Sequence, residues 1–161
     1  LAAARVPRDV PAPVPLDPVS VRAAEPRDAD RVLKLMEDLT RPTVADDPQP
    51  QRDVFFAHLG HPDCRVYVAE LDGEVAGAVS LWIQPRLNWT TPQGWIPDLF
   101  VDEEFRRRGA ARALLDACAE ECRRRGCHVL TLESGHHRAE AHQLYESYGF
   151  VHHARAYVLT L

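Results

Sequence analysis

The sequence predicts an α/β fold in one domain, built on a mixed sheet. The clearest pattern runs from residue 95 to residue 133: an apolar strand, a short turn, an amphipathic helix and a second strand. A helix that joins two such strands predicts a right-handed crossover between parallel strands. A second pattern, at residues 65–84, predicts an antiparallel hairpin. A chain of 161 residues has room for one hydrophobic core of this kind.

The N-terminal part is predicted to hold a tail, a strand and two helices. Residues 1–18 contain five prolines and little periodicity, so we expect a Pro-rich tail ahead of a domain that spans residues 19–161. Alternation at residues 19–22 predicts the first strand. Pro26 suits the start of a helix whose apolar side continues at helical spacing to Leu39. A loop at residues 41–50 and a shorter helix at residues 51–59 complete this part.

The middle and the end of the chain are predicted to consist mainly of strands. Residues 65–70 and 77–84 are the two arms of the hairpin, and Asp72-Gly73 is its turn signal. A loop at residues 85–94 then leads to the strand at residues 95–101. Two final strands are expected at residues 150–153 and 156–161.

The helix of the crossover carries a complete apolar stripe. Its apolar residues recur with the helical period, and a run of arginines followed by Gly126 marks its C-terminal end. The stripe consists of Ala111, Leu114, Leu115, Cys118, Ala119 and Cys122.

The run from Arg106 to Ala111 predicts a loop that binds a diphosphate. Gly109 and the alanines after it let the backbone come close to a ligand, and the unpaired N–H groups of the first helical turn favour a negative charge. The guanidinium groups can add charge-assisted hydrogen bonds. A dinucleotide fold would need Gly-x-Gly-x-x-Gly after the strand, which is missing. A Walker loop would need Gly-Lys-Ser/Thr, and the only lysine is Lys34.

At these residues the chain resembles the GNAT superfamily of N-acetyltransferases. The residues with the spacing of its acetyl-CoA motif are Val101, Arg106, Gly109 and Ala111. Downstream, residues 141–150 resemble its second signature, a helix that contains Tyr145 and is followed by Gly-Phe. The resemblance covers roughly residues 19–161.

Two segments are most similar to the aminoalkylphosphonate N-acetyltransferases within that superfamily. They are residues 88–101 and residues 138–142. Many relatives have an asparagine where this chain has Arg138, so the capping of this helix start is left open.

The resemblance implies a fold, a co-substrate and a reaction. The fold is a GNAT-like, mostly antiparallel mixed sheet with a central pair of parallel strands, flanked by helices. Acetyl-CoA is the expected co-substrate, and its acetyl group is expected to pass to a primary amine of a small molecule by direct attack in a ternary complex. Two alternatives stay open: transfer to a protein or peptide amine, and a module that binds acyl-CoA without turnover. The residues expected to hold acetyl-CoA are Leu99, Phe100, Val101, Arg106, Arg107, Arg108, Gly109, Ala110, Ala111 and Arg112.

Tyr145 is the expected general acid. In the superfamily, the tyrosine of the second signature protonates the departing CoA thiolate, and this role maps onto Tyr145. A phenol of pKa ~10 can protonate a thiolate of pKa ~8.5 only as a positioned donor, which suits general-acid assistance. The alternative is that Tyr145 only packs, because it shares a helical stripe with Ala141 and Tyr148.

Asp98 is the expected acceptor of the amine proton. An alkyl amine has a pKa near ~10 and must lose a proton before it attacks. Alternation puts Asp98 on one face of its strand with Ile96 and Phe100, and relatives commonly have an acid on this strand near the acceptor. The alternative is a structural carboxylate. Glu133 and Ser134, at the tip of the following strand, are reserve candidates.

The remainder of the expected site is an oxyanion donor and an acceptor pocket. The donor is expected from a backbone N–H near Phe100 or Val101, where a bulge commonly splays the strand. The pocket is expected between residues 36–56 and 84–95, where arginines would suit an amine with a phosphonate or carboxylate and aspartates a polycation. Solvated loop surface is the alternative. The side chains in question are Arg41, Asp46, Asp47, Arg52, Trp82, Arg86, Trp89 and Trp95.

Composition excludes several classes of partner. The net charge of −5 and the lack of a basic face argue against nucleic acid. No apolar run approaches the ~20 residues of a membrane helix and no leader pattern opens the chain, so we expect a cytoplasmic protein, with a homodimer as a possible assembly. The four cysteines form no Cys-x-x-Cys pair and the histidines do not stack on one helix face, so no metal site is expected.

Overall fold

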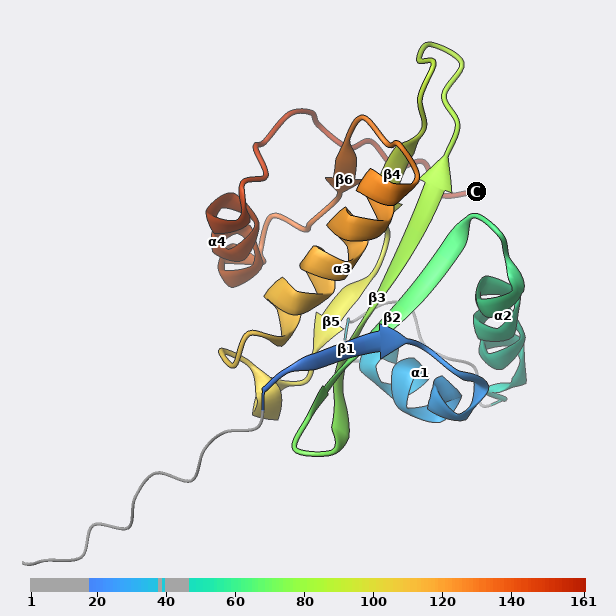
Figure 1. Ribbon diagram of the computed structural model, residues 1–161, viewed down its shortest axis with the longest axis vertical. Helices are drawn as coiled ribbons and strands as arrows, with labels where there is room; N and C mark the ends of the chain where they lie inside the picture. Colours follow the sequence, from blue (N-terminus) through green and yellow to red (C-terminus); the bar gives the residue numbers. More distant parts are fainter. Residues whose placement is uncertain (1–17, 38, 40–46) are drawn as a thin grey trace, which may run out of the picture.

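The computed structural model describes residues 18–37, residue 39 and residues 47–161 (Figure 1). The expected tail up to residue 17 and most of the expected loop, residues 41–46, therefore lie outside the described residues.

In the described part of the chain, six strands form one mixed sheet in the order β1-β2-β3-β4-β6, and β5 pairs with β3 beyond the end of β4. The pairing of β4 with β6 is parallel and every other pairing is antiparallel, so the expected parallel pair is confirmed. Among the described residues β6 is the last strand of the order, so the pair lies at the edge of the sheet rather than at its centre. Asp72 and Gly73 both have positive φ, as a type I′ hairpin turn between β2 and β3 requires. The strands are β1 (Ser20–Ala23), β2 (Cys64–Leu71), β3 (Glu74–Gln84), β4 (Gln93–Ile96), β5 (Leu99–Val101) and β6 (Leu130–Leu132).

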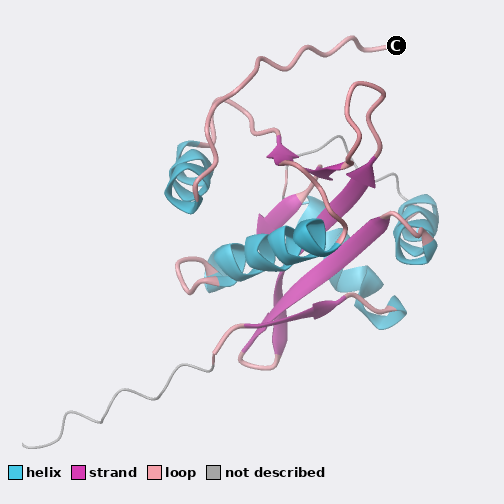
Figure 2. Cartoon of the chain, turned by 45° about the horizontal axis from the view of Figure 1, so that its top comes forward, coloured by secondary structure: helices cyan, strands magenta, loops and turns pink. Residues whose placement is uncertain are grey.

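Helices cover both faces of the sheet. One face carries α1 and α2, and the other carries α3, which is the crossover between the parallel strands (Figures 1 and 2). A short 3-10 turn at Pro26–Asp28 leads into α1, in agreement with the predicted role of the proline. The helices are α1 (Ala29–Glu37), α2 (Gln49–Gly60), α3 (Ala110–Arg124) and α4 (Ala139–Tyr148).

The core has two halves, one on each face of the sheet. On one face Leu35 and Phe55, from α1 and α2, pack against β2, β3 and β5. On the other face the apolar stripe of α3 packs against the sheet, and Leu114, Leu115 and Cys118 are fully buried. The burial of this stripe confirms the predicted amphipathic helix.

The cysteines belong to this packing. Burial raises the pKa of the Cys64 thiol to about 11 and that of Cys122 to about 12, and it raises the pKa of Cys118 still further. All four are free thiols. Thiols that stay protonated are poor nucleophiles, so Cys64, Cys118 and Cys122 act as small apolar side chains.

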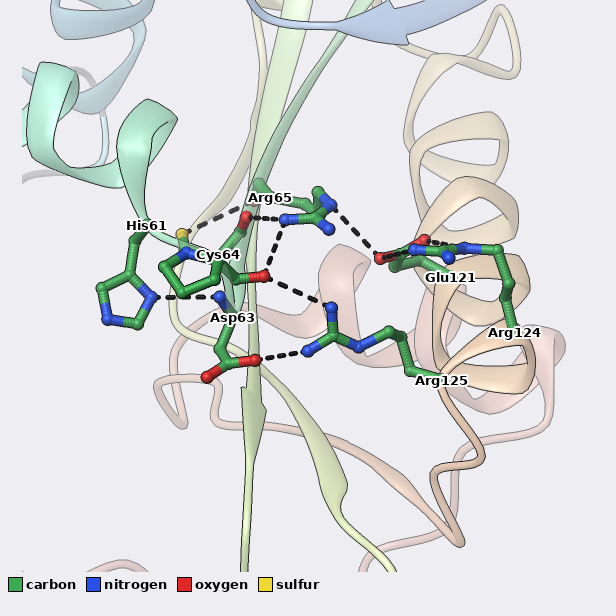
Figure 3. A network of polar contacts seen from close by, with 8 residues as sticks. His61, Asp63, Cys64, Arg65, Glu121, Arg124 and Arg125 are labelled. Atoms are coloured by element: carbon green, nitrogen blue, oxygen red, sulfur yellow. Dashed lines mark hydrogen bonds and ion pairs between the residues drawn. The ribbon is translucent and has the colours of Figure 1, made fainter.

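A polar network fastens the C-terminal end of α3 to the start of β2 (Figure 3). The buried carboxylate of Glu121 accepts hydrogen bonds from Arg124 at 2.6 and 2.8 Å and lies 3.2 Å from the Arg65 guanidinium. One turn later Arg125 pairs with Asp63. The direction of α3, and with it the position of its N-terminus, is thereby tied to the central hairpin.

The end of the chain differs from the prediction. Two strands were expected at residues 150–153 and 156–161, but residues 150–161 form no regular structure and the last of them run out from the body (Figure 2). Their apolar side chains are largely exposed, with Leu159 at 83% and Leu161 at 110%. Alternation predicts which faces a strand would have, but a strand also needs a hydrogen-bonding neighbour, which this segment lacks among the described residues.

None of the helices in the described part has the length and apolar character that a membrane crossing requires. The same part contains no group of three or more His, Cys, Asp or Glu side chains placed to hold a metal ion.

Candidate active site

A cavity of about 260 Å³ lies where β4 and β6 end. Because these strands are parallel, their carboxyl ends meet at one edge of the sheet, which is where open α/β sheets bind ligands. Leu39, which follows α1, closes one side, and Arg138, before α4, and Tyr145, in the second half of α4, close another. The lining residues are Leu39, Ile96, Pro97, Leu99, Leu132, Glu133, Ser134, Gly135, His137, Arg138 and Tyr145.

The cavity opens because one strand is interrupted. The pairs on either side of the interruption are Trp95 with Trp82 and Leu99 with Val79. This leaves one more residue on β4–β5 than on β3, which is a β-bulge at Pro97 and Asp98. In the described part of the chain β6 pairs with β4 but not with β5. The strand that continues from β4 into β5 therefore separates from β6 after Ile96.

The bulge overturns one expectation from the sequence. Alternation placed Ile96, Asp98 and Phe100 on one face, but Ile96 packs in the α3 half of the core and Phe100 in the half under α1 and α2. One extra residue in a strand moves every later side chain to the opposite face, which sequence alternation cannot reveal.

Asp98 sits on this bulge. Its carboxylate accepts a hydrogen bond of 3.0 Å from Ser80 Oγ on β3, and its backbone carbonyl accepts one of 2.9 Å from the Ser80 N–H. Asp98 does not line the cavity, although both of its chain neighbours do. Glu133, the reserve candidate, does line it.

Backbone donors face the gap between β5 and β6. Asp98 O and Asp102 N both bond to β3, and bonding alternates along an antiparallel strand. The N–H of Phe100 therefore faces β3, whereas the N–H groups of Leu99 and Val101 face the gap. Of the two residues expected to supply an oxyanion donor, Val101 presents its N–H there and Phe100 does not.

Tyr145 projects from α4 into the cavity. Its ring meets Phe150 edge to face, with 5.9 Å between the centroids. Within the described residues its hydroxyl has no hydrogen-bond partner. Burial raises the pKa of the phenol, and the charge of Arg138 opposes this rise. The group is therefore a protonated donor at neutral pH.

The predicted diphosphate loop turns its backbone outward. Gly109 caps α3 with φ of 90°, a left-handed conformation that suits glycine, and Arg107 also has positive φ, at 62°. Such turns expose successive N–H groups toward an anion. The first N–H groups of α3, starting at Ala110, have no intrahelical acceptor and point the same way.

The arginines of this loop have structural partners. Arg108 forms two hydrogen bonds, of 2.7 and 2.9 Å, with Asp72 in the β2–β3 turn. The Arg106 guanidinium lies 5.5 Å from the centre of the Phe100 ring and donates to Val101 O at 3.2 Å. These two side chains hold the loop against the sheet.

Polar contacts connect α4 to α3 and to the loop. No residue of α4 is fully buried, but Leu144, Tyr145 and Tyr148 are partly buried against the α3 half of the core. Tyr148 donates to Asp116 at 2.8 Å, and the Arg112 guanidinium lies 5.4 Å from the centre of the Tyr148 ring. Arg112 also donates to Ser147, and Arg107 pairs with Glu140. Burial and the bond to Asp116 raise the pKa of Tyr148 to about 12.

The side chains expected around the acceptor do not gather in one place. Trp89 stacks on His128 with 4.3 Å between ring centroids, and with Arg86 it lines a separate depression near Arg125. Arg52 pairs with Asp30. Arg41 and Asp46 lie outside the described residues.

Sequence reasoning missed some residues of the cavity. The sequence predicts Leu39 only as part of the apolar side of a helix, and it predicts no role in the site for His137. Arg138 was noted as a departure from the usual asparagine, which was the available signal, but its side chain lines the cavity rather than only preceding a helix.

Comparison with known proteins agrees with this geometry. The model of the acetyltransferase (GNAT) family matches residues 32–150. The aminoalkylphosphonate N-acetyltransferase of Salmonella typhimurium is 32% identical over 81% of this chain and 83% of its own. The glucosamine 6-phosphate N-acetyltransferase of Trypanosoma brucei brucei is 32% identical over 60% of this chain and 65% of its own. A solved structure, a putative acetyltransferase from Agrobacterium tumefaciens, superimposes with a TM-score of 0.78 at 29% identity, covering 88% of this chain and 99% of that one.

The attachment of α4 gives a testable prediction. Tyr148→Phe removes the hydroxyl that bonds Asp116, a loss of about 1 kcal/mol for an exposed bond to a charged group. Amide hydrogen exchange in α4 should then become roughly five-fold faster, while exchange in α3 stays as it was. Tyr157→Phe is the control, because that side chain is 89% exposed. Equal α4 exchange in the two variants would contradict the role given to the Asp116 bond.

Proposed function

The chain belongs to the acetyltransferase (GNAT) family, and we infer that its acceptor is a primary amine of a small molecule, which attacks acetyl-CoA directly in a ternary complex. Membership makes the protein an acetyl-CoA-dependent N-acetyltransferase. The nature of the acceptor and the roles of individual residues are our proposal.

One observation carries the proposal. A protonated tyrosine hydroxyl, free of hydrogen-bond partners within the described residues, projects into the cavity at which two parallel strands separate. A module that only binds acyl-CoA has no use for such a donor. The cavity volume of about 260 Å³ suits a small amine better than a peptide. Two of the relatives are named as acetyltransferases of aminoalkylphosphonate and of glucosamine 6-phosphate, and both of these acceptors are small amines.

Acetyl-CoA binding divides between backbone and side chains. We propose that the pantetheine arm occupies the gap between β5 and β6, where the N–H groups of Leu99 and Val101 are available. The diphosphate then meets the N–H groups from Gly109 onward, with the dipole of α3 behind them. Arg107 and Arg112 supply charge, while Arg106 and Arg108 shape the loop, and the Phe100 ring supports Arg106.

The reaction then requires three proton transfers. The neutral amine nitrogen attacks the thioester carbon, and the carbonyl oxygen becomes an oxyanion that the Leu99 or Val101 N–H stabilises. The C–S bond breaks, and the Tyr145 hydroxyl gives its proton to the leaving sulfur. The substrate ammonium becomes this neutral amine by giving a proton to Asp98 before the attack, and the Ser80 hydroxyl orients the Asp98 carboxylate. The proton that the nitrogen loses after the attack restores the Tyr145 hydroxyl. Because Asp98 lies beside the cavity rather than in its lining, the transfer to Asp98 runs through a water molecule.

Other expectations remain part of the proposal. These are the Pro-rich tail of residues 1–18 ahead of one catalytic domain, a homodimeric assembly, and a cytoplasmic location. Free thiols such as Cys118 persist in a reducing compartment, which supports that location.

The acceptor class is tested by CoA release from acetyl-CoA across a panel of amines. Turnover is expected with short primary amines and not with peptides. Turnover with peptides alone would favour a protein acceptor, and binding of acetyl-CoA without turnover on any amine would favour the binding module.

Tyr145→Phe tests the general acid. Loss of a positioned proton donor should lower kcat by roughly 10²–10⁴-fold and leave acetyl-CoA affinity nearly unchanged. In the parent enzyme, the raised pKa of the Tyr145 phenol keeps the donor protonated. The activity of the parent enzyme should therefore begin to fall only above pH ~10. Tyr157→Phe is again the matched control. If the Tyr145→Phe enzyme has the same kcat as the parent enzyme, Tyr145 contributes packing only.

Asp98→Asn and Glu133→Gln separate the two candidate bases. The amide introduced by Asp98→Asn keeps an acceptor for Ser80, so the fold should persist. If Asp98 takes the amine proton, its variant should lose kcat/KM most at low pH and regain part of it as pH rises, because the amine is then deprotonated in solution. The Glu133→Gln profile should stay parallel to the parent. The same pH-dependent loss in Glu133→Gln instead would assign the base to Glu133.

A further inference from the structure

Arg138 differs from most of the arginines that the structure describes. Most of them pair with a carboxylate, as Arg22 does with Asp28 and Arg108 with Asp72. In the described part of the chain, those without such a partner are Arg86, Arg112, Arg138 and Arg155. Among these, Arg138 is the one that lines the catalytic cavity.

The guanidinium of Arg138 reaches across the cavity. The residue caps the start of α4, and its Nη2 donates to the carbonyl oxygen of Leu39 at 2.8 Å. Leu39 follows α1 and packs in the half of the core under α1 and α2. The side chain therefore spans from the helix of Tyr145 to the opposite wall. One backbone carbonyl uses a single donor of the five that a guanidinium carries.

The cavity holds charges of both signs. Glu133 lines it at the tip of β6, and Arg138 with His137 lines the side formed by α4. A half-buried guanidinium that bonds only a carbonyl retains its charge and most of its donors for a ligand. The fork geometry of these donors matches the two oxygens of a carboxylate, phosphonate or phosphate.

We propose that Arg138 binds an acidic group of the acceptor, so that the substrates are short primary amines that also carry a carboxylate, phosphonate or phosphate. The inference rests on the proposed function and narrows its substrate class. Arg138 is then a specificity-determining residue, and its interaction with the acid holds the amine toward the thioester.

The test compares acidic and neutral amines of matched length on the full chain. The amines are 2-aminoethylphosphonate, β-alanine and β-alaninamide, and the variants are Arg138→Gln, Arg138→Lys and, as a control, Arg155→Gln. The amide introduced by Arg138→Gln keeps hydrogen-bond donors on a shorter side chain but has no charge. We expect Arg138→Gln to lower kcat/KM for the two acids by about 10–100-fold and to change β-alaninamide turnover and the acetyl-CoA KM little. Arg138→Lys should keep part of the preference, and Arg155→Gln all of it.

The comparison of the two acids identifies the group that Arg138 prefers. An equal loss on all three amines, or a raised acetyl-CoA KM, would mean that Arg138 supports α4 or the cofactor, and it would overturn the inference. A parent enzyme that turns over only β-alaninamide would overturn it as well, with the proposed function intact.

A binding measurement separates failure of the inference from failure of the proposed function. 2-Aminoethylphosphonate should raise the Tm of the parent protein and not that of Arg138→Gln. This shift without turnover on any amine would contradict the proposed function and leave the acid site standing. If the acidic amines give neither a Tm shift nor turnover, the proposed acid site is overturned.

Discussion

The bulge at Pro97 and Asp98 is the constraint on which the site depends. Up to Ile96 the strand has a parallel neighbour, β6, and beyond the bulge its only neighbour among the described residues is β3. The backbone of Leu99 and Val101 therefore has donors that no strand uses. Proline contributes directly, because it brings no N–H to the ladder at the point where pairing ends. The cavity, the free N–H groups and the change of side-chain face all follow from one additional residue.

Two attachments hold the helices around this gap, and they differ in kind. The C-terminal end of α3 is fixed by the buried carboxylate of Glu121 between two arginines. In contrast, α4 has no fully buried residue and is held by partly buried side chains such as Leu144 and by exposed polar contacts such as that of Tyr148 with Asp116. Exposed polar contacts contribute little free energy each, so α4 opens at lower cost than α3. The helix that carries Tyr145 is thus the more easily moved wall of the cavity.

Arginine residues perform several separate tasks in this chain. Arg108 fastens the diphosphate loop to the β2–β3 turn, and Arg65 joins the sheet to α3. Arg107 connects the same loop to α4, and Arg112 connects the first turn of α3 to α4, so a diphosphate bound there would compete with those contacts. The loop and the helix of Tyr145 are for this reason electrostatically coupled. Composition alone shows only that arginine is abundant, and the partners of each residue decide its task.

Residue patterns were enough to predict most of the local elements and the chemistry of the motifs. Period and turn signals were sufficient for the hairpin at Asp72-Gly73, for the buried stripe of α3 and for the parallel pair, because these depend on residues close in the chain. Tyr145 was singled out differently, by the resemblance of residues 141–150 to the second GNAT signature. Only the tertiary structure decided which way Ile96, Asp98 and Phe100 face, because a bulge leaves no periodic signal. It also decided that Arg138 meets Leu39, and that residues 150–161 have no neighbouring strand, because both depend on segments far apart in sequence.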